Sequence, residues 1–207
     1  MKRTLRGLYV ITEDRPPHTR PLLTGVEAAL RGGARIVQYR DKSDEAGRRL
    51  DEARRLRQLC HRYDALFLIN DDVRLAASAS ADGVHLGRDD ADIAAARRQL
   101  PAGALIGVSC YNEFALARRA AGQGASYIAF GSFHPSPTKP QAARAQPELL
   151  QRARRELSLP TVAIGGISPE NGAALVNAGA DMLAVISAVF AAPDVEIAVR
   201  AFTACFN

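Results

Sequence analysis

This sequence of 207 residues has few cysteines and no long apolar run. The three cysteines, Cys60, Cys110 and Cys205, lack the spacing of metal ligands, so we expect reduced thiols and a cytoplasmic protein. No apolar segment reaches the roughly 20 residues that a membrane-spanning helix needs. Met1 to Thr4 lead directly into a strand pattern and not into the apolar core of a signal peptide. We therefore expect no membrane association.

The basic residues do not have the distribution typical of a nucleic-acid-binding protein. The formal net charge is +5 and the isoelectric point is about 9.4, which raises that possibility. However, many arginines form pairs such as Arg48-Arg49 and Arg97-Arg98 on expected outer helices, often beside Asp or Glu, and no aromatic residues interleave with them. We therefore expect small-molecule partners and no nucleic acid. A monomer and a homo-oligomer are both compatible with the sequence.

Short apolar runs alternate with amphipathic stretches along the whole chain. Strands are expected at residues 7–12, 34–39, 66–69, 83–86, 105–108, 126–130, 161–167 and 182–187. Helices are expected at residues 22–30, 44–61, 73–78, 91–99, 112–123, from 147 onwards, 169–177 and 195–202. Gly32-Gly33 is expected to stop the first helix, and Asn112 is expected to cap the fifth.

Eight strands, each followed by a helix and with no internal linker, predict one α/β domain over residues 1–207. The fold that fits is a single (β/α)8 TIM barrel, in which the active site lies at the C-terminal ends of the strands. An open doubly wound sheet is the alternative, because a lone glycine-rich strand end occurs in both folds.

The seventh and eighth expected strands end in small residues that suit a phosphate group. The seventh runs from Thr161 through Gly165-Gly166 to a helix start at Ser168, and the eighth ends at Ser187. Bare backbone N–H groups and a hydroxyl at two neighbouring strand ends form a phosphate-binding cradle, and this is the usual phosphate position in a TIM barrel. Alternatively, the two glycines only allow a helix to pack against the strand.

Charged residues at the other expected strand ends indicate a second anionic substrate. Arg40, Lys42 and Lys139 supply enough positive charge to balance a diphosphate. Asp71 and Asp90 follow neighbouring strands and suit Mg²⁺, which binds one or two carboxylates together with phosphate oxygens. The strand ends carry no Cys/His pair and no Ser/His/Asp order, so covalent nucleophilic catalysis is not indicated.

Several of these residues also have structural interpretations. Asp71 alone could cap the helix after the third strand, and its pairing with Asp90 is what favours a metal site. Asp72 and Asp89 are expected to be helix caps or solvated charges. His85 lies within a strand, where we expect a hydrogen-bonded core residue and not a ligand.

Seven short segments follow one another in a recognisable order. They are Gln38-Tyr39-Arg40-Asp41-Lys42, Ile69-Asn70-Asp71, His85-Leu86-Gly87 with Asp90, Gly107-Val108-Ser109, Gly131 to Lys139, Ile164-Gly165-Gly166-Ile167 and Ile186-Ser187. Together they resemble the thiamine-phosphate synthase family, at family-like spacing over nearly the whole chain. One such segment is a weak signal, whereas seven in order are specific. Asp41 departs from the pattern, because the family often has Glu there.

The resemblance implies a transferase of thiamine biosynthesis that joins 4-amino-2-methyl-5-(diphosphooxymethyl)pyrimidine to 4-methyl-5-(2-phosphoethyl)thiazole, or to its carboxylated form, and releases pyrophosphate through a pyrimidine carbocation. The implied substrate-binding residues are Gln38, Tyr39, Arg40, Asp41, Lys42, Asn70, Ser109, Ser136, Pro137, Thr138, Lys139, Gly166, Ile186 and Ser187. The implied catalytic residues are Lys139, Ser109, Arg40 and Lys42. The implied cofactor is Mg²⁺, with Asp71 and Asp90 as its ligands.

Three other functions fit a barrel of this kind. A thiazole tautomerase would have little need for a diphosphate site with a metal, and a non-catalytic sensor of thiamine phosphates would tolerate loss of the metal carboxylates and Lys139. A phosphosugar isomerase would want a Glu or His base at a strand end, and the fold alone does not separate these functions. The presence of Arg40, Lys42, Asp71, Asp90 and Lys139 favours the synthase.

Overall fold

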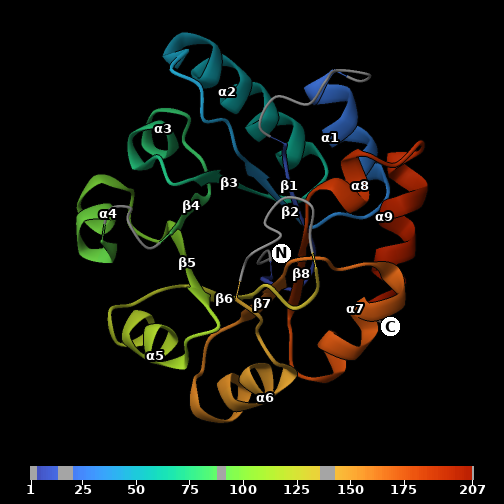
Figure 1. Ribbon diagram of the computed structural model, residues 1–207. Coiled ribbons are helices and arrows are strands. Elements are labelled where there is room, and N and C mark those ends of the chain that lie inside the picture. Colours follow the sequence, from blue (N-terminus) through green and yellow to red (C-terminus); the bar gives the residue numbers. More distant parts are fainter. Residues whose placement is uncertain (1–3, 14–20, 88–91, 136–142, 207) are drawn as a thin grey trace.

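The chain folds into a closed barrel of parallel strands surrounded by helices, as expected (Figure 1). The structure is a computed structural model that describes residues 4–13, 21–87, 92–135 and 143–206. Its strands are β1 (Gly7–Ile11), β2 (Ile36–Tyr39), β3 (Leu66–Asn70), β4 (Gly83–Leu86), β5 (Leu105–Tyr111), β6 (Tyr127–Gly131), β7 (Thr161–Ile164) and β8 (Met182–Val185). Because β8 pairs in parallel with β1, the sheet has no open edge, and this excludes the doubly wound alternative.

The helices follow the strands in turn. They are α1 (Leu22–Arg31), α2 (Ala46–Arg62), α3 (Val73–Ser78), α4 (Ile93–Gln99), α5 (Phe114–Gly122), α6 (Pro147–Glu156), α7 (Pro169–Asn177), α8 (Ser187–Phe190), α9 (Val195–Thr203) and the 3₁₀ turn η1 (Ala204–Phe206). Among the described residues, no helix has both the length and the apolar character needed to cross a membrane.

The strands divide the apolar core into two layers because successive side chains point to opposite faces. The inner layer fills the barrel and is built from strand residues alone, among them Ile36, Leu68 and Met182. The outer layer joins the other faces of the strands to the helices, as Val37 and Phe67 do. A polar residue on the inward face near a strand's C-terminal end therefore lies at the barrel mouth.

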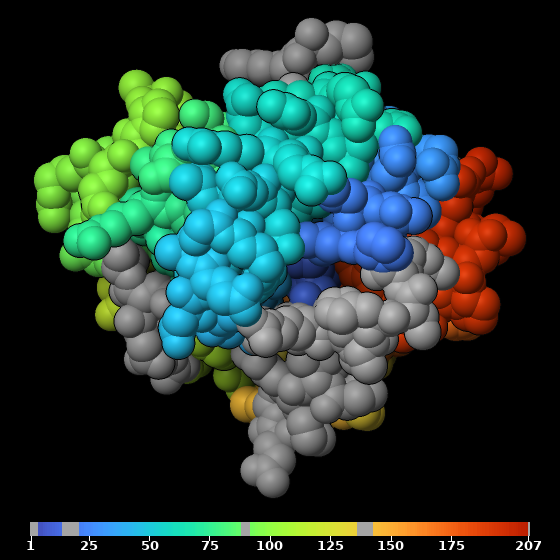
Figure 2. Space-filling model, turned by 90° about the horizontal axis from the view of Figure 1, so that it is seen from above, coloured from blue at the N-terminus to red at the C-terminus, as the bar shows by residue number. Residues whose placement is uncertain are grey.

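Helices from the two ends of the chain lie side by side and complete the outer ring. Figure 2 shows α1 in blue between α2 in cyan and α9 in red. Gly32, which ends α1, lies so close to α9 that a Cβ atom there would be 2.6 Å from the Cβ of Val199. The sequence predicted this glycine as a helix stop, and the structure adds that it also permits the contact.

Two local expectations were wrong. The fifth helix begins at Phe114 after Glu113 and is not capped by Asn112, because β5 extends to Tyr111 through a register shift against β6. Ser187 is not the last strand residue but the first residue of the short helix α8, which the sequence pattern did not predict. The other expected helices and strands are present, with bounds shifted by a few residues.

Candidate active site

The C-terminal ends of the parallel strands meet at one mouth, and the structure brings several predicted site residues together there. Gln38 lies on β2 and the segment 40–42 follows that strand, Asn70 ends β3 and Asp71 follows it, and Ser109 lies on the inward face of β5. Gly166 follows β7, while Ile186 and Ser187 follow β8. The predicted residues Asp89, Asp90, Ser136, Pro137, Thr138 and Lys139 lie outside the described residues.

Asp71 is the centre of a small charged cluster at this mouth. Its Oδ2 atom pairs with the Lys42 ammonium and accepts a hydrogen bond of 2.6 Å from the Asn70 amide. The backbone at Asp71 has φ +61°, a left-handed conformation that Asp tolerates better than most residues, and its N–H donates to the His85 carbonyl at 2.8 Å. Two residues predicted to bind substrate, Lys42 and Asn70, are thus in direct contact with one predicted to bind Mg²⁺.

The neighbouring Asp72, and not Asp71, caps the helix after β3. Its Oδ1 accepts a 2.9 Å hydrogen bond from the backbone N–H of Leu75, and its Oδ2 pairs with Arg49 at 2.9 Å. Asp72 is therefore a structural cap, as expected, and the capping interpretation of Asp71 is wrong. The Asp71 carboxylate instead contacts Lys42 and Asn70 at the mouth.

The carboxylate of Asp71 suits a magnesium ion. Its side chain is 24% exposed, so a carboxylate oxygen can meet a bound ion, and Mg²⁺ needs only one or two protein carboxylates when phosphate oxygens complete its shell. In the described part of the chain, no three His, Cys, Asp or Glu side chains cluster as metal ligands. The second expected ligand, Asp90, lies outside that part.

The structure does not bring the Tyr39 and Asp41 side chains together with Gln38. Strand alternation turns Tyr39 toward α2, where its hydroxyl donates a 2.6 Å hydrogen bond to Glu52. Asp41 accepts from the backbone N–H of Ser43 at 2.7 Å and pairs with Arg48 at 2.7 Å. These side chains hold the loop that carries Arg40 and Lys42.

Arg48 and Thr12 also hold the loop that carries Arg40 and Lys42, and neither was predicted from the sequence. Arg48 contacts Asp41, Glu45 and Glu52 at once. Thr12 is buried at the end of β1, and its hydroxyl accepts a 2.9 Å hydrogen bond from the backbone N–H of Arg40. The sequence signal for Thr12 was its place as the polar end of an apolar strand.

Replacing Arg48 by methionine is expected to make the fold more sensitive to acid. Burial raises the pKa of Asp41, but the hydrogen bonds from Ser43 and the interaction with Arg48 outweigh it and lower the pKa to about 2. Because the unfolded value is about 3.9, this carboxylate stabilises the fold above about pH 4, and the contribution is lost as the pH falls toward 2. Arg48→Met should shift acid unfolding to higher pH and lower the free energy of unfolding at neutral pH by about 1–2 kcal/mol.

Circular dichroism during acid titration, together with urea unfolding at neutral pH, measures both effects. Arg200→Met is the matched control, because Arg200 is 66% exposed and pairs with Glu196 on the surface of α9. If the two variants unfold at the same pH, the Arg48 cluster does not stabilise the loop as described.

A continuous hydrogen-bonded chain crosses the barrel below the mouth. The Gln38 amide donates to the Tyr9 hydroxyl at 2.6 Å, and this hydroxyl lies 3.0 Å from that of Tyr127. The Tyr127 hydroxyl lies 3.0 Å from Nδ1 of His85, whose Nε2 is 2.9 Å from the Ser109 hydroxyl. The expectation of a hydrogen-bonded His85 is confirmed, while Tyr9 and Tyr127 were not predicted to be near the site.

The titratable side chains in this series of hydrogen bonds are neutral at neutral pH. Burial raises the pKa values of Tyr9 and Tyr127 well above the ordinary value, and it lowers the pKa of His85 to about 4. The imidazole of His85 stacks on the Tyr127 ring with centroids 5.6 Å apart. A neutral imidazole with both nitrogens engaged is not placed to act as a general base.

The glycines after β7 allow a close approach between two loops. Gly165 and Gly166 have φ +101° and +61°, and the His134 N–H donates to the Gly165 carbonyl at 2.9 Å. A Cβ atom on Gly165 would lie 2.0 Å from the Ser132 hydroxyl, and one on Gly166 would lie 2.2 Å from the Pro135 carbonyl oxygen. The glycines thus pack against the loop after β6 and not against a helix, as the structural alternative had it, and this contact shapes the end of β7 where a phosphate was expected.

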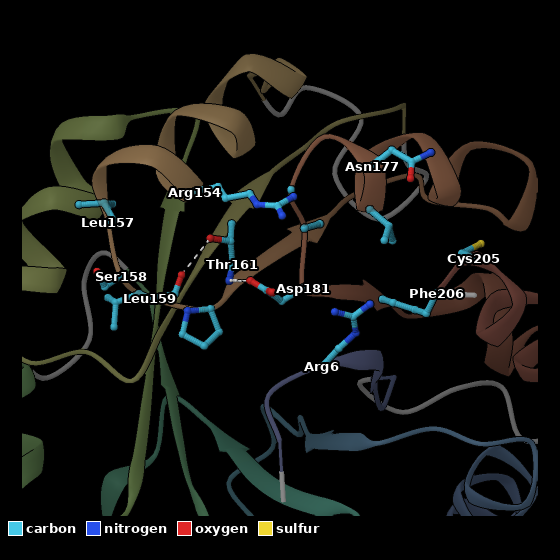
Figure 3. Close-up of a pocket in the computed structure, with 14 residues that line it drawn as sticks. Arg6, Arg154, Leu157, Ser158, Leu159, Thr161, Asn177, Asp181, Cys205 and Phe206 are labelled. Atoms are coloured by element: carbon cyan, nitrogen blue, oxygen red, sulfur yellow. Dashed lines mark hydrogen bonds between the residues drawn. The ribbon is translucent and has the colours of Figure 1, made fainter.

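A cavity of about 540 Å³ lies at the opposite end of the barrel (Figure 3). It is lined by residues at the starts of β7 and β8, such as Thr161 and Asp181, and by Arg6 and Arg154. The Asp181 carboxylate accepts a 2.9 Å hydrogen bond from the Thr161 N–H, which ties the two strands together. None of the predicted site residues lines this cavity, and the N-terminal end of a TIM barrel generally serves stability and not catalysis.

Comparison with known proteins gives a consistent picture. The family model described as thiamine monophosphate synthase matches residues 8–189. The thiamine-phosphate synthase of Thioalkalivibrio sulfidiphilus is 52% identical over 98% of this chain and 96% of its own length. That of Chromobacterium violaceum is 52% identical over 100% of this chain and 99% of its own. A solved structure, thiamine phosphate pyrophosphorylase from Pyrococcus furiosus, superposes with a TM-score of 0.86 at 36% identity, covering 96% of this chain and 94% of the other.

Proposed function

This chain belongs to the thiamine monophosphate synthase family, and from that premise we propose that it condenses 4-amino-2-methyl-5-(diphosphooxymethyl)pyrimidine with 4-methyl-5-(2-phosphoethyl)thiazole or its carboxylated form. The products are thiamine phosphate and pyrophosphate, and the carboxylated thiazole also releases its carboxyl group as CO₂. The family predicted from the seven segments is confirmed, and with it the enzyme class, a transferase of thiamine biosynthesis. The observation that carries the finer proposal is the contact of Lys42, Asp71 and Asn70 at the barrel mouth.

The two halves of the mouth are proposed to bind different substrates. Gln38 offers its amide to the pyrimidine, and Arg40 and Lys42 balance the charges of the diphosphate. The ends of β7 and β8, with Gly166, Ile186 and Ser187, accept the phosphate of the thiazole. Outside the described residues, Ser136 and Thr138 are proposed to bind the same phosphate, and Lys139 is proposed to stabilise the leaving pyrophosphate. Binding both partners in one mouth converts the reaction into a step between fixed neighbours.

The reaction is proposed to begin with heterolysis of the C–O bond between the pyrimidine methylene group and the diphosphate. The electron pair leaves with pyrophosphate, and the lone pair of the thiazole nitrogen then forms the new C–N bond to the pyrimidine carbocation. Fixed positive charge and the Ser109 hydroxyl stabilise the charge that grows on the leaving group. No base is needed, because the attacking nitrogen carries no proton, and the neutral His85 agrees with that requirement.

Asp71, together with Asp90, is proposed to hold Mg²⁺. When bound, this ion would neutralise negative charge on the pyrophosphate oxygens. The Lys42 ammonium lies beside the same carboxylate, so that Asp71 also orients a cation toward the diphosphate.

The direct test is an assay of the purified protein with Mg²⁺ and both substrates. Pyrophosphate and thiamine phosphate should form in equal amounts, because one bond is broken for each bond that is formed. Omitting the thiazole phosphate or chelating Mg²⁺ should reduce product formation to background. Absence of pyrophosphate release from the complete mixture would refute the proposal, and conversion of the carboxylated thiazole phosphate alone would favour a tautomerase.

A further inference from the structure

Five inward-facing side chains from five strands form one hydrogen-bonded chain inside the barrel. Gln38 of β2, Tyr9 of β1, Tyr127 of β6, His85 of β4 and Ser109 of β5 are joined by contacts of 2.6, 3.0, 3.0 and 2.9 Å. Its two ends are residues to which the proposed function gives roles, Gln38 on the pyrimidine and Ser109 on the pyrophosphate. The three middle residues have no role in that function so far.

The barrel interior is shaped around the middle of this chain. Tyr9 and Tyr127 are fully buried among apolar side chains, where an unmade hydrogen bond would be costly. Gly107 on β5 makes room for the Tyr127 ring, because a Cβ atom at that position would lie 1.9 Å from Cζ of Tyr127. A side chain at Gly107 would displace the hydroxyl that bridges Tyr9 and His85.

With the Gln38 amide nitrogen as the donor to Tyr9, one direction of the hydrogen bonds gives every buried hydroxyl of the chain a partner. The Gln38 amide nitrogen only donates, so the Tyr9 oxygen accepts from it and gives its own hydrogen to Tyr127. Tyr127 then donates to Nδ1 of His85, and the one hydrogen of the neutral imidazole is on Nε2, facing the Ser109 oxygen. Ser109 accepts this bond and keeps its hydroxyl hydrogen for another partner.

The orientation of the Gln38 amide therefore determines whether the Ser109 hydroxyl can donate a hydrogen bond to a ligand. In the described part of the chain, Gln38 Oε1 has no protein donor, so the amide presents an acceptor to a ligand while Ser109 presents a donor. If the Gln38 amide turned over, every bond would reverse, and Ser109 would donate to His85 instead. Ser109 would then have no hydrogen for a phosphate oxygen.

We propose that Tyr9, Tyr127 and His85 are positioning residues that couple the amide orientation of Gln38 to the donor state of Ser109. An amino group of the pyrimidine, by donating to Gln38 Oε1, holds the chain in the direction that aims the Ser109 hydrogen at the leaving pyrophosphate. This inference rests on the proposed function, because that function places the pyrimidine at Gln38 and the pyrophosphate at Ser109.

The tautomer of His85 is the first test, and it is measured on the native protein without a substrate. Nitrogen NMR of isotope-labelled histidine distinguishes a protonated from a bare ring nitrogen, and a His85→Gln sample assigns the signal. The expected result in the native protein is hydrogen on Nε2 and none on Nδ1. Hydrogen on Nδ1 would overturn the proposal, because the chain would then run in the opposite direction.

The second test removes one hydroxyl from the middle of the chain. Tyr9→Phe keeps the ring but separates Gln38 from Tyr127, and it should lower kcat about tenfold while changing either KM by less than about twofold. In a protein that already carries Ser109→Ala, adding Tyr9→Phe should lower kcat by less than about twofold, because the effect of Tyr9 passes through Ser109. Full activity of Tyr9→Phe, or equal losses in both backgrounds, would overturn the coupling.

Tyr63→Phe is the matched control, because the Tyr63 hydroxyl donates to Glu27 on the outer surface at 3.2 Å and lies outside the chain. It should leave kcat unchanged. The two proposals fail separately. An inactive native protein refutes the proposed function but leaves the NMR measurement valid, whereas an active native protein with an equally active Tyr9→Phe variant refutes only the coupling.

Discussion

Replacing Asp71 by asparagine is expected to lower kcat by about 100-fold or more, because a charged group that acts on the leaving diphosphate is lost. The change removes the charge that pairs with Lys42 and that would bind Mg²⁺, but it keeps the size of the side chain. Asparagine also tolerates the left-handed backbone at this position, where alanine would add strain. The free energy of unfolding should fall by no more than about 1 kcal/mol, because the ion pair is partly exposed.

The neighbouring Asp72 supplies the control with the same chemical change. Asp72→Asn keeps a good helix cap for α3, since asparagine caps as well as aspartate, and removes only the pair with Arg49. Its kcat should equal that of the native protein. Steady-state kinetics over a range of Mg²⁺ concentrations, with calorimetric titration of Mg²⁺ in the presence of pyrophosphate, compares the two variants. Equal activity in both would exclude Asp71 from the reaction.

Replacing Gly165 by alanine is expected to lower kcat/KM for the thiazole phosphate by about 100-fold, because it displaces one wall of the mouth. The added Cβ atom would lie 2.0 Å from the Ser132 hydroxyl and 2.8 Å from the Ser132 Cα, so the backbone of that loop must move. The Ser132 hydroxyl also donates to the His134 carbonyl at 2.8 Å, so it cannot simply rotate away. The left-handed φ of +101° adds strain of about 1–3 kcal/mol to the folded state.

Gly103→Ala separates the two causes. Gly103 has φ +86°, but no atom lies within 4 Å of an added Cβ, so alanine there adds backbone strain without a collision. Both variants should lose stability in urea unfolding, whereas only Gly165→Ala should lose activity when rates are corrected for the folded fraction. If Gly165→Ala binds the thiazole phosphate normally, the β7 end does not form that subsite.

Much of the fold was predictable because its signals are local. Apolar runs of strand length and amphipathic helices recur in a fixed order, and parallel strands bring their C-terminal ends to one mouth in a barrel. Arg40, Lys42, Asn70 and Asp71 could therefore be assigned to one mouth before any contact was known. The outward orientation of Tyr39 could also have been predicted from the sequence. Successive side chains of a strand point to opposite faces, so if Gln38 points into the barrel, Tyr39 must point out of it.

The sequence by itself determined the order of strands and helices, the family and the residues that follow each strand, since each depends on short-range pattern or on ordered motifs. Only the tertiary structure decided which side chains meet: that Asp72 is the cap and Asp71 faces Lys42, that Arg48 supports the loop, and that Tyr9 and Tyr127 share a hydrogen bond. Such contacts join residues up to 118 positions apart. They depend on how the closed barrel staggers its strands and on the space that a residue such as Gly107 leaves, which periodicity in the sequence does not encode.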